Sequence, residues 1–245
     1  MTMNFWGGIL MYKRIVLKLS GEALAGDKPG VKFDNDIIRG IVLQIKEIMS
    51  KGTEVTLVIG GGNFWRGRSA DHAMDRTKAD QIGMLATIMN AIYVADFLRQ
   101  EGVGAVVQTP FKCGTMTEEF SKDSAMARVK NGEVVIFAGG LGHPMFSTDT
   151  ITALRGAELE VDGLFFAKNI DGVYDDDPAK NPNAKKIEEI KCGDIIKNNL
   201  RVIDLTAATL CFDNRIPVVI FGLNDENSIV RAVGGEKIGT VVTVG

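Results

Sequence analysis

The sequence predicts an α/β fold in which helices cover both faces of a central, mostly parallel β-sheet, forming a three-layer αβα sandwich. Short runs rich in Val, Ile and Phe alternate with longer segments of helical periodicity along most of the chain, which is typical of β-α-β units. Most of these runs are apolar at nearly every position, as expected of parallel strands that are buried on both faces. The chain of 245 residues is long enough for one large domain with a sizeable core.

The predicted elements follow one another in regular alternation. The strands are residues 14–20, 54–59, 104–109, 133–138, 163–168, 217–223 and 238–244. Between the first two strands, apolar residues spaced along 37–49 fall on one face of a helix, which Gly52 ends. A longer helix is predicted over residues 79–99, and its apolar residues cover more than one narrow stripe. Such a helix needs a second surface to bury, which the sheet or another subunit would supply.

Residues 169–186 interrupt this alternation. They are rich in Asp, Pro, Asn and Lys, a composition that predicts turns and is too polar for a core. We therefore expect the boundary between two lobes there.

The composition excludes several classes of protein. Hydrophobic residues make up 45% and charged residues 24%, the ordinary balance of a folded globular protein. Because the formal net charge is −3, there is no overall basic surface for nucleic acid, and anionic ligands must be held by local groups. Cys113, Cys192 and Cys211 are odd in number and lack Cys-x-x-Cys spacing, which predicts neither disulfides nor a zinc site and fits a reducing cytoplasm. Residues 1–11 have no basic segment and only a short apolar run, so we expect a disordered extension, not a signal peptide or a membrane span.

The end of the first predicted strand carries a lysine, a serine and a glycine. Lys18 lies in an otherwise apolar strand, where a charge is costly unless it meets an opposite charge. An isolated lysine could extend along the strand toward solvent. Ser20 and Gly21 favour a second interpretation, because a small hydroxyl residue and a glycine let backbone N–H groups approach a polyphosphate.

Two glycine-rich segments follow other predicted strands. The glycines at 60–62 come directly after a strand, and Arg66 adds a guanidinium that can bind a phosphate through two N–H groups. Alone, three glycines indicate only a tight turn. Residues 139–149 are also glycine-rich and end in Ser-Thr-Asp, for which a helix cap is the simplest interpretation. Because the carboxyl ends of parallel strands meet at one edge of a sheet, the three segments together predict an anion-binding site there.

These motifs resemble those of the bacterial UMP kinases, a group within the amino acid kinase superfamily. The segments that carry the resemblance are 18–24, 60–67, 84–87, 147–149, 171–174, 177–180 and 202–205. The resemblance runs from about residue 12 to the C-terminus and implies a single amino acid kinase domain over 12–245. It implies an acceptor-binding lobe at about 12–165 and an ATP-binding lobe at about 166–245. The activity it implies is transfer of the γ-phosphoryl group of ATP to UMP, giving UDP and ADP, in pyrimidine nucleotide biosynthesis.

The resemblance also implies roles for individual residues. The expected catalytic residues are Lys18, Arg66, Asp149 and Asp204. The residues expected to contact ATP are Lys18, Leu19, Ser20, Gly21, Gly62, Arg66, Lys168, Asn169, Tyr174 and Asp177. Those expected to contact UMP are Gly61, Arg66, Asp80, Leu141, Gly142, His143, Pro144, Met145, Phe146, Ser147 and Thr148. Asp80 would accept from the ribose hydroxyls, and Arg66 would neutralise the UMP phosphate.

The acidic residues have further expected roles. Asp149 and Asp204 would organise the lysine and the Mg²⁺ that enters with ATP, and no residue is expected to be a dedicated metal ligand. Independently of the resemblance, Asp204 is also predicted to cap a helix over residues 205–212.

The chain departs from the commonest family pattern at a few positions. Leu141 and His143 stand where Thr and Asn are often found, and Lys168-Asn169 replaces a Thr-Lys pair of some members. The resemblance further implies a cytoplasmic homohexamer activated by GTP and inhibited by UTP, with the loop at 26–32 near the regulatory region, and no nucleic-acid or membrane partner.

Three alternatives remain on the sequence alone. One is a kinase of the same superfamily that acts on a carboxylate or on carbamate, although no room is left for a C-terminal regulatory domain. Another is a non-catalytic relative that binds a nucleotide or an oxyanion, and the third is a regulatory UMP sensor. Joint presence of Lys18, Arg66, Asp80 and Asp204 argues against the non-catalytic relative.

Overall fold

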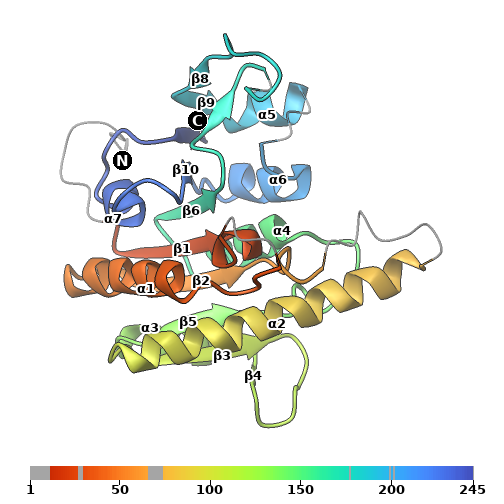
Figure 1. Ribbon diagram of the computed structural model, residues 1–245, viewed down its shortest axis with the longest axis vertical. Helices are drawn as coiled ribbons and strands as arrows, with labels where there is room; N and C mark the ends of the chain where they lie inside the picture. The colour runs from red at the N-terminus through yellow and green to blue at the C-terminus, as the bar shows by residue number, and fades with distance from the viewer. Residues whose placement is uncertain are drawn as a thin grey trace.

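A nine-stranded sheet with the order β4-β3-β5-β2-β1-β6-β10-β11-β9 runs through the molecule (Figure 1). The computed structural model describes residues 12–26, 30–65, 74–176, 178–198, 200 and 202–244. The strands are β1 (Arg14–Leu19), β2 (Glu54–Ile59), β3 (Ala105–Thr109), β4 (Glu118–Glu119), β5 (Val134–Phe137), β6 (Gly163–Lys168), β9 (Glu189–Lys191), β10 (Val218–Gly222) and β11 (Thr240–Thr243). Neighbours pair in parallel except β10 and β11, which are antiparallel, so the predicted α/β class with a mostly parallel sheet is confirmed.

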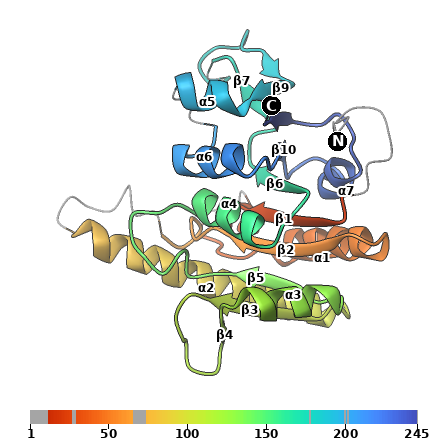
Figure 2. The same cartoon turned by 180° about the vertical axis from the view of Figure 1, so that it is seen from behind.

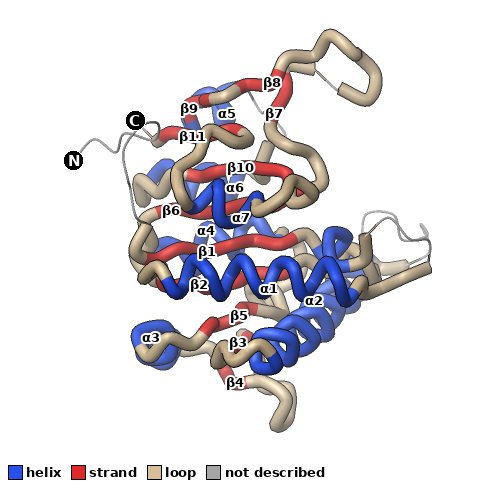
Figure 3. Tube along the Cα trace, turned by 60° about the vertical axis from the view of Figure 1, so that its left-hand side comes forward, coloured by secondary structure: helices blue, strands red, loops and turns tan. Residues whose placement is uncertain are grey.

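Helices cover both faces of this sheet. They are α1 (Asn35–Ser50), α2 (Arg76–Gln100), α3 (Lys122–Lys130), α4 (Thr148–Glu158), α5 (Cys192–Asn198), α6 (Leu205–Asp213) and α7 (Ser228–Val233), with a 3₁₀ turn η1 (Gly21–Leu24). In Figure 3, α1 and α7 lie in front of the strands, and Figure 2 shows α3, α4, α5 and α6 on the opposite face. The three layers predicted from the sequence are therefore present.

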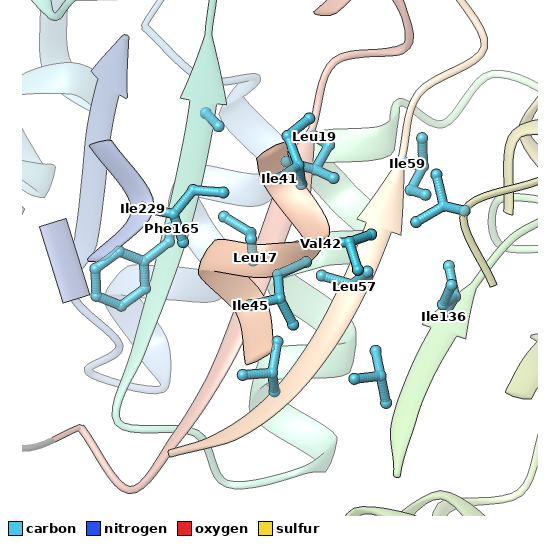
Figure 4. Close-up of a cluster of buried hydrophobic side chains, with 14 of the residues drawn as sticks. Leu17, Leu19, Ile41, Val42, Ile45, Leu57, Ile59, Ile136, Phe165 and Ile229 are labelled. Carbon is cyan, nitrogen blue, oxygen red and sulfur yellow. The ribbon is translucent and has the colours of Figure 1, made fainter. Parts of the chain in front are cut away.

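Successive side chains of each strand point to opposite faces of the sheet, so the core consists of two clusters, one on each face. Leu17 and Leu57 pack with α1, α2 and α7, whereas the adjacent residues Val16 and Val58 pack with α3, α4 and α6. Figure 4 shows the first of these clusters, in which side chains of α1 lie over β1 and β2. Each such large apolar side chain contributes on the order of 1.5–3 kcal/mol when it is fully buried.

The predicted strands and helices agree with the structure to within a few residues. The two long helices extend slightly beyond their predicted bounds, since α2 begins at Arg76 and α1 at Asn35. The short elements β4, β9, α3, α5 and α7 were not predicted. Residues 169–186, predicted to form only turns, contain β7 (Val173–Tyr174), which pairs with β8 (Lys186–Ile187) in a separate two-stranded sheet. The proposed lobe division near residue 165 falls inside β6 and stays a prediction.

The helix α2 is apolar around most of its circumference, as predicted. Val94 and Leu98 are completely buried, while Leu85 and Met89 on another side are about half exposed. By length and composition alone, α2 could cross a membrane, but half of its most apolar window is buried within the protein. The core helix of a water-soluble protein has the same character, so α2 gives little support for a membrane span. The three cysteines are free, as predicted, and the predicted N-terminal extension lies outside the described residues.

Candidate active site

The loops that follow β1 and β2 are in direct contact at the carboxyl edge of the sheet. The Gly60 N–H donates to the Leu19 carbonyl oxygen over 2.9 Å. A Cβ atom at Gly21 would lie only 2.4 Å from the Gly60 oxygen, so no residue with a side chain fits at position 21. Likewise, a Cβ at Gly61 would lie 2.9 Å from both the Gly83 oxygen and the Ala86 Cβ of α2. These glycines are required by close packing of backbone as well as by any approach of a ligand.

Lys18 and Asp149 form an ion pair at the centre of this edge. The Lys18 Nζ lies 2.6 Å from the Asp149 Oδ1, and the two side chains are 12% and 16% exposed. Burial alone would raise the pKa of Asp149, but the positive charges of Lys18 and Lys168 outweigh it and hold that pKa below its ordinary value. The charge of Lys18 is therefore matched within the protein, as the sequence required for a lysine in an apolar strand.

A second acidic group holds the start of α4 in place. Ser147 is the N-cap of α4, and its Oγ accepts from the N–H groups of Asp149 and Thr150. The same hydroxyl donates to the Asp204 carboxylate, which also accepts from the Thr150 Oγ1 over 3.0 Å. Asp204 in turn accepts from the N–H of Ala207 and caps α6, as predicted. Asp204 thus contacts Ser147 and Thr150, which flank residues 148–149, and Asp149 pairs with Lys18.

Lys168 brings a second cation close to this pair. Its Nζ donates to the Val202 carbonyl oxygen over 2.6 Å. Burial lowers the pKa of Lys168; the negative charge of Asp149 opposes this shift, and the positive charge of Lys18 adds to it. Lys18 and Lys168 therefore place two ammonium groups close to Asp149, with Asp204 nearby at Ser147 and Thr150, and ammonium groups at this edge are suited to a polyphosphate.

One pocket lies between α2 and the glycine-rich loop after β5, and we call it the α2 pocket. It encloses about 160 Å³. Its lining residues are Gly61, Trp65, Ala79, Asp80, Gly83, Met84, Thr87, Gly140, His143, Pro144, Phe146, Ser147 and Thr148. Asp80 accepts from the N–H of Met145 over 2.9 Å. Because Met145 has a left-handed backbone conformation, with φ of 75°, this bond helps to hold a strained loop.

A second, wider pocket lies beside the small sheet, and we call it the β7 pocket. It encloses about 700 Å³. Its lining residues are Lys168, Ile170, Gly172, Val173, Tyr174, Asp175, Asp176, Pro178, Ile187, Leu200, Val202 and Ile220. The Tyr174 hydroxyl donates to the Asp171 Oδ1 over 2.8 Å, and the Lys186 Nζ approaches the other oxygen of that carboxylate. Apolar walls with a few polar groups are typical of a small-molecule site.

The structure brings together many of the residues that the sequence singled out. Those that line the α2 pocket are Gly61, Asp80, His143, Pro144, Phe146, Ser147 and Thr148. Lys168 and Tyr174 line the β7 pocket. Leu19, Ser20, Gly21, Gly62 and Asn169 line neither pocket and lie at or just after the ends of β1, β2 and β6. Arg66 and Asp177 fall outside the described residues.

Three residues of the predicted UMP set do not line the α2 pocket. They are Leu141, Gly142 and Met145. Leu141 packs against the core, and Gly142 approaches Pro110 so closely that a Cβ would lie 3.1 Å from the proline ring. These residues shape the loop that lines the pocket.

Several lining residues were not predicted. Trp65 lines the α2 pocket, and its indole Nε1 is buried without a hydrogen-bond partner among the described residues. Met84 and Thr87 belong to a motif that carried the resemblance, yet no role was assigned to them. Helical spacing was the available clue, since residues 80, 83, 84 and 87 recur at intervals of three and four and so share one face of α2. The hydrophobic walls of the β7 pocket had no such pattern.

No group of three or more His, Cys, Asp or Glu side chains that could hold a metal occurs in the described part of the chain.

Comparisons with known proteins extend over nearly the whole chain. Residues 13–222 match the amino acid kinase family. The uridylate kinase of Streptococcus thermophilus is 48% identical over 234 residues, covering 95% of each chain. The structure is similar to that of UMP kinase from Bacillus anthracis, with a TM-score of 0.90 and 34% identity over 95% of this chain and 96% of the other. UMP kinase from Ureaplasma parvum gives a TM-score of 0.88 and 36% identity over 95% and 99%.

Proposed function

The chain belongs to the amino acid kinase family and, within it, to the uridylate kinases, and we propose that it transfers the γ-phosphoryl group of ATP to the phosphate of UMP. The products are UDP and ADP, and the reaction supplies pyrimidine nucleotide biosynthesis. The expected place of this reaction is the cytoplasm.

The observation that carries this proposal is the position of the Lys18–Asp149 pair relative to both pockets. Thr148, the neighbour of Asp149, lines the α2 pocket. Lys168 lines the β7 pocket, and its charge acts on Asp149 and Lys18. A charged centre that joins two separate pockets is what transfer between two nucleotides requires.

We assign the α2 pocket to UMP. Asp80 would accept from the ribose hydroxyls, and Arg66 would bind the phosphate as a two-pronged donor. Ser147 and Thr148 add hydroxyl groups at the N-terminus of α4, where backbone N–H groups favour an anion. The pocket is small, which suits a mononucleotide that must be held in one orientation.

We assign the β7 pocket to the base and ribose of ATP. Tyr174 and Lys168 lie in its wall, and Asn169 and Asp177 are next to residues that line it. The ATP phosphates would then extend toward Lys18 and the loops that carry Ser20, Gly21 and Gly62.

The mechanism follows from the charge of the acceptor. A phosphate monoester is already anionic at neutral pH, so no general base is needed, and catalysis consists of positioning and charge neutralisation. Lys18 would stabilise the transferred phosphoryl group, Asp149 would orient Lys18, and Asp204 would hold the start of α4 through Ser147. Each of these side chains contributes by geometry fixed before the substrates bind.

Mg²⁺ would enter with ATP, held mainly by the phosphate oxygens, with Asp149 and Asp204 as the carboxylates of the site. Its contribution would be to neutralise charge on the β- and γ-phosphates.

An acceptor panel tests the proposal. ADP release is measured with UMP, CMP, dUMP, aspartate and acetylglutamate, and UDP is identified as the product. We expect UMP to be preferred over every other acceptor. Turnover of a carboxylate in preference to UMP would establish the superfamily alternative, and no turnover with any acceptor would support a binding protein.

We further propose that the exposed apolar face of α2 forms a symmetric contact between two subunits, and that three such dimers make a hexamer. Ile82, Leu85, Met89 and Ile92 on this helix are 37–54% exposed. Leu85→Glu should reduce the assembly measured by light scattering, whereas Leu43→Glu on α1, at a similarly exposed leucine, should not. Activation by GTP and inhibition by UTP are expected to weaken with the assembly. A wild-type protein that is a fully active monomer would exclude this proposal.

A further inference from the structure

The buried face of α2 holds a polar residue that the proposed mechanism does not yet use. Asn90 has no exposed surface, although it lies among apolar neighbours in the core. Burying an amide is costly unless all of its hydrogen-bonding groups find partners. Its partners therefore indicate what it does.

Asn90 is bonded to the glycine loop that follows β2. Its Nδ2 donates to the Gly60 carbonyl oxygen over 2.6 Å and to the Asn63 Oδ1 over 2.8 Å. In return, the Asn63 Nδ2 donates to the Asn90 Oδ1 over 3.0 Å. Asn63 is itself held by two hydrogen bonds to Lys32. The Asn63 Nδ2 donates to the backbone carbonyl oxygen of Lys32, and the Lys32 Nζ donates to the backbone carbonyl oxygen of Asn63, each over 2.8 Å.

The bond to Gly60 sets the orientation of one peptide group. A peptide is planar and trans, so the carbonyl of Gly60 and the N–H of Gly61 point in opposite directions. With the Gly60 oxygen held by Asn90, the Gly61 N–H must point to the opposite side. No described residue accepts a hydrogen bond from the N–H groups of Gly61 or Gly62. The oriented N–H is thus available to a ligand.

This peptide needs such an anchor more than others do. A peptide between two glycines can rotate with little steric cost, because neither residue has a Cβ atom that excludes positive φ. Packing places Gly61 against α2, and the Gly60 N–H and the Gly61 carbonyl on either side of this peptide have backbone partners. The hydrogen bond from Asn90 gives the Gly60 carbonyl between them a fixed partner on a rigid helix.

The same helix face fixes the second glycine loop. Thr87 is three residues before Asn90, and its Oγ1 accepts from the Gly139 N–H over 2.8 Å. Asp80, seven residues before Thr87, holds the loop at Met145. One row of side chains on α2 thereby connects both loops to the wall of the α2 pocket.

We infer that Asn90 is a positioning residue for the proposed reaction, because it holds the Gly60–Gly61 peptide in the orientation that presents the Gly61 N–H to the acceptor phosphate. This inference rests on the proposed function of the site. Asn90 acts through the peptide and does not touch the substrate.

Steady-state kinetics of Asn90→Ala test the inference. We expect kcat/KM for UMP to fall on the order of 10²-fold, the usual effect of losing one oriented donor. The KM for ATP should change by less than about threefold, since ATP is assigned to the other pocket. Asn63→Ala, which leaves the bond from Asn90 to Gly60 in place, should cost less, on the order of tenfold.

Two variants on the same helix serve as controls. Val94→Ala removes buried apolar volume and should lower the unfolding temperature without changing the kinetics. Tyr93→Phe removes a hydrogen bond from α2 to Asn35 that does not involve the glycine loop. If Val94→Ala loses as much kcat/KM for UMP as Asn90→Ala, the effect is one of stability and the inference is wrong.

A crystal structure of the Asn90→Ala protein shows the orientation of the Gly60–Gly61 peptide directly. This measurement does not depend on which acceptor the enzyme uses. We expect the Gly60 carbonyl to be rotated or to occupy two orientations. An unmoved carbonyl contradicts the inference even if activity falls, and if Asn90→Ala does not fold, the same comparison is made with Asn90→Leu, which keeps a similar volume and removes the Nδ2 donor. Absence of UMP turnover in the wild type would instead contradict the proposed function, so the two failures are distinguishable.

Discussion

The α2 pocket and the β7 pocket differ in how their walls are held. The loops around the α2 pocket are tied to one long helix by buried hydrogen bonds from Asp80, Thr87 and Asn90. The β7 pocket is more than four times as large and is bordered by two-residue strands. Tyr174, in its wall, is bonded to Asp171, whose side chain is 43% exposed to solvent. The α2 pocket is thus arranged before a ligand arrives, whereas the β7 pocket can adapt to its ligand.

This difference suits the roles that we propose. The acceptor phosphate must be placed in line with the transferred group, and small errors in position reduce the rate steeply. The adenine and ribose lie far from the reacting atoms and need only be retained. Substitutions in the α2 pocket and at the Lys18–Asp149 pair should therefore have large and specific effects on the kinetics. Substitutions in the β7 pocket should have small effects.

Lys18→Ala should have the largest effect, because Lys18 serves both nucleotides where they meet. We expect kcat to fall on the order of 10² to 10³-fold, comparable to the loss of one preorganised electrostatic donor. Binding of UMP measured by calorimetry should change little, since the lysine is assigned to the transferred phosphoryl group. Activity within a few-fold of wild type would show that phosphoryl transfer does not take place at Lys18.

Asp149→Asn should reduce stability in a pH-dependent manner. The pKa of Asp149 is lowered in the folded protein, so the ion pair stabilises the fold at neutral pH, and this contribution is lost as the pH falls below the ordinary Asp value of 3.8. Removing one partner of a buried pair costs about 3 kcal/mol.

Urea unfolding of wild type and variant at pH 7 and at pH 3 measures the difference for Asp149→Asn. The free energies of unfolding should differ at pH 7, and the difference should be smaller at pH 3. An equal difference at both pH values would mean that the ion pair is not its source.

Arg66→Ala and Asp80→Ala should each raise the KM for UMP more than the KM for ATP. Removing Arg66 leaves a phosphate without its charged partner, so the KM for UMP should rise by about 10- to 100-fold. Asp80→Ala should raise it by about tenfold, since hydrogen bonds to the ribose and to the Met145 N–H are both lost. Steady-state kinetics with each substrate varied in turn gives both KM values. Equal increases for ATP and UMP would assign these residues to the fold.

Tyr174→Phe should have the smallest effect. The variant keeps the ring in the wall of the β7 pocket and loses the bond from the hydroxyl to Asp171. We expect the KM for ATP to rise by about two- to threefold, because solvent weakens this partly exposed bond to the Asp171 carboxylate. The KM for UMP should not change. A tenfold effect would show that the β7 pocket is as rigid as the α2 pocket.

The sequence predicts the layers of the fold and much of the site, for physical reasons that differ from residue to residue. Buried parallel strands are nearly continuous apolar runs, so β1 and β6 could be located closely. Lys18 could be identified because a charged residue is rare in such an apolar run. The glycines at 60–62 could be identified because three consecutive glycines directly follow a predicted strand. The two-residue strands β7 and β8 have no periodicity to detect.

The parts that could not be predicted depend on contacts between distant segments. Asn90 is an ordinary polar residue in a helical segment until the fold brings Gly60 and Asn63 to it. Trp65 and Met84 are apolar residues, and the sequence alone would place such residues in the core. They line the α2 pocket because of how the neighbouring loops fold. Two-residue strands and pocket walls are set by tertiary packing, which local sequence does not encode.

Simultaneous binding of two nucleotides tests the central claim most directly. UMP is titrated by calorimetry into the protein alone and into the protein saturated with Mg²⁺ and an ATP analogue whose γ-phosphate cannot be transferred. If the α2 and β7 pockets hold different nucleotides, UMP binds with one site per chain in both titrations. Loss of UMP binding when the analogue is present would show that the two nucleotides share one pocket and would contradict the account.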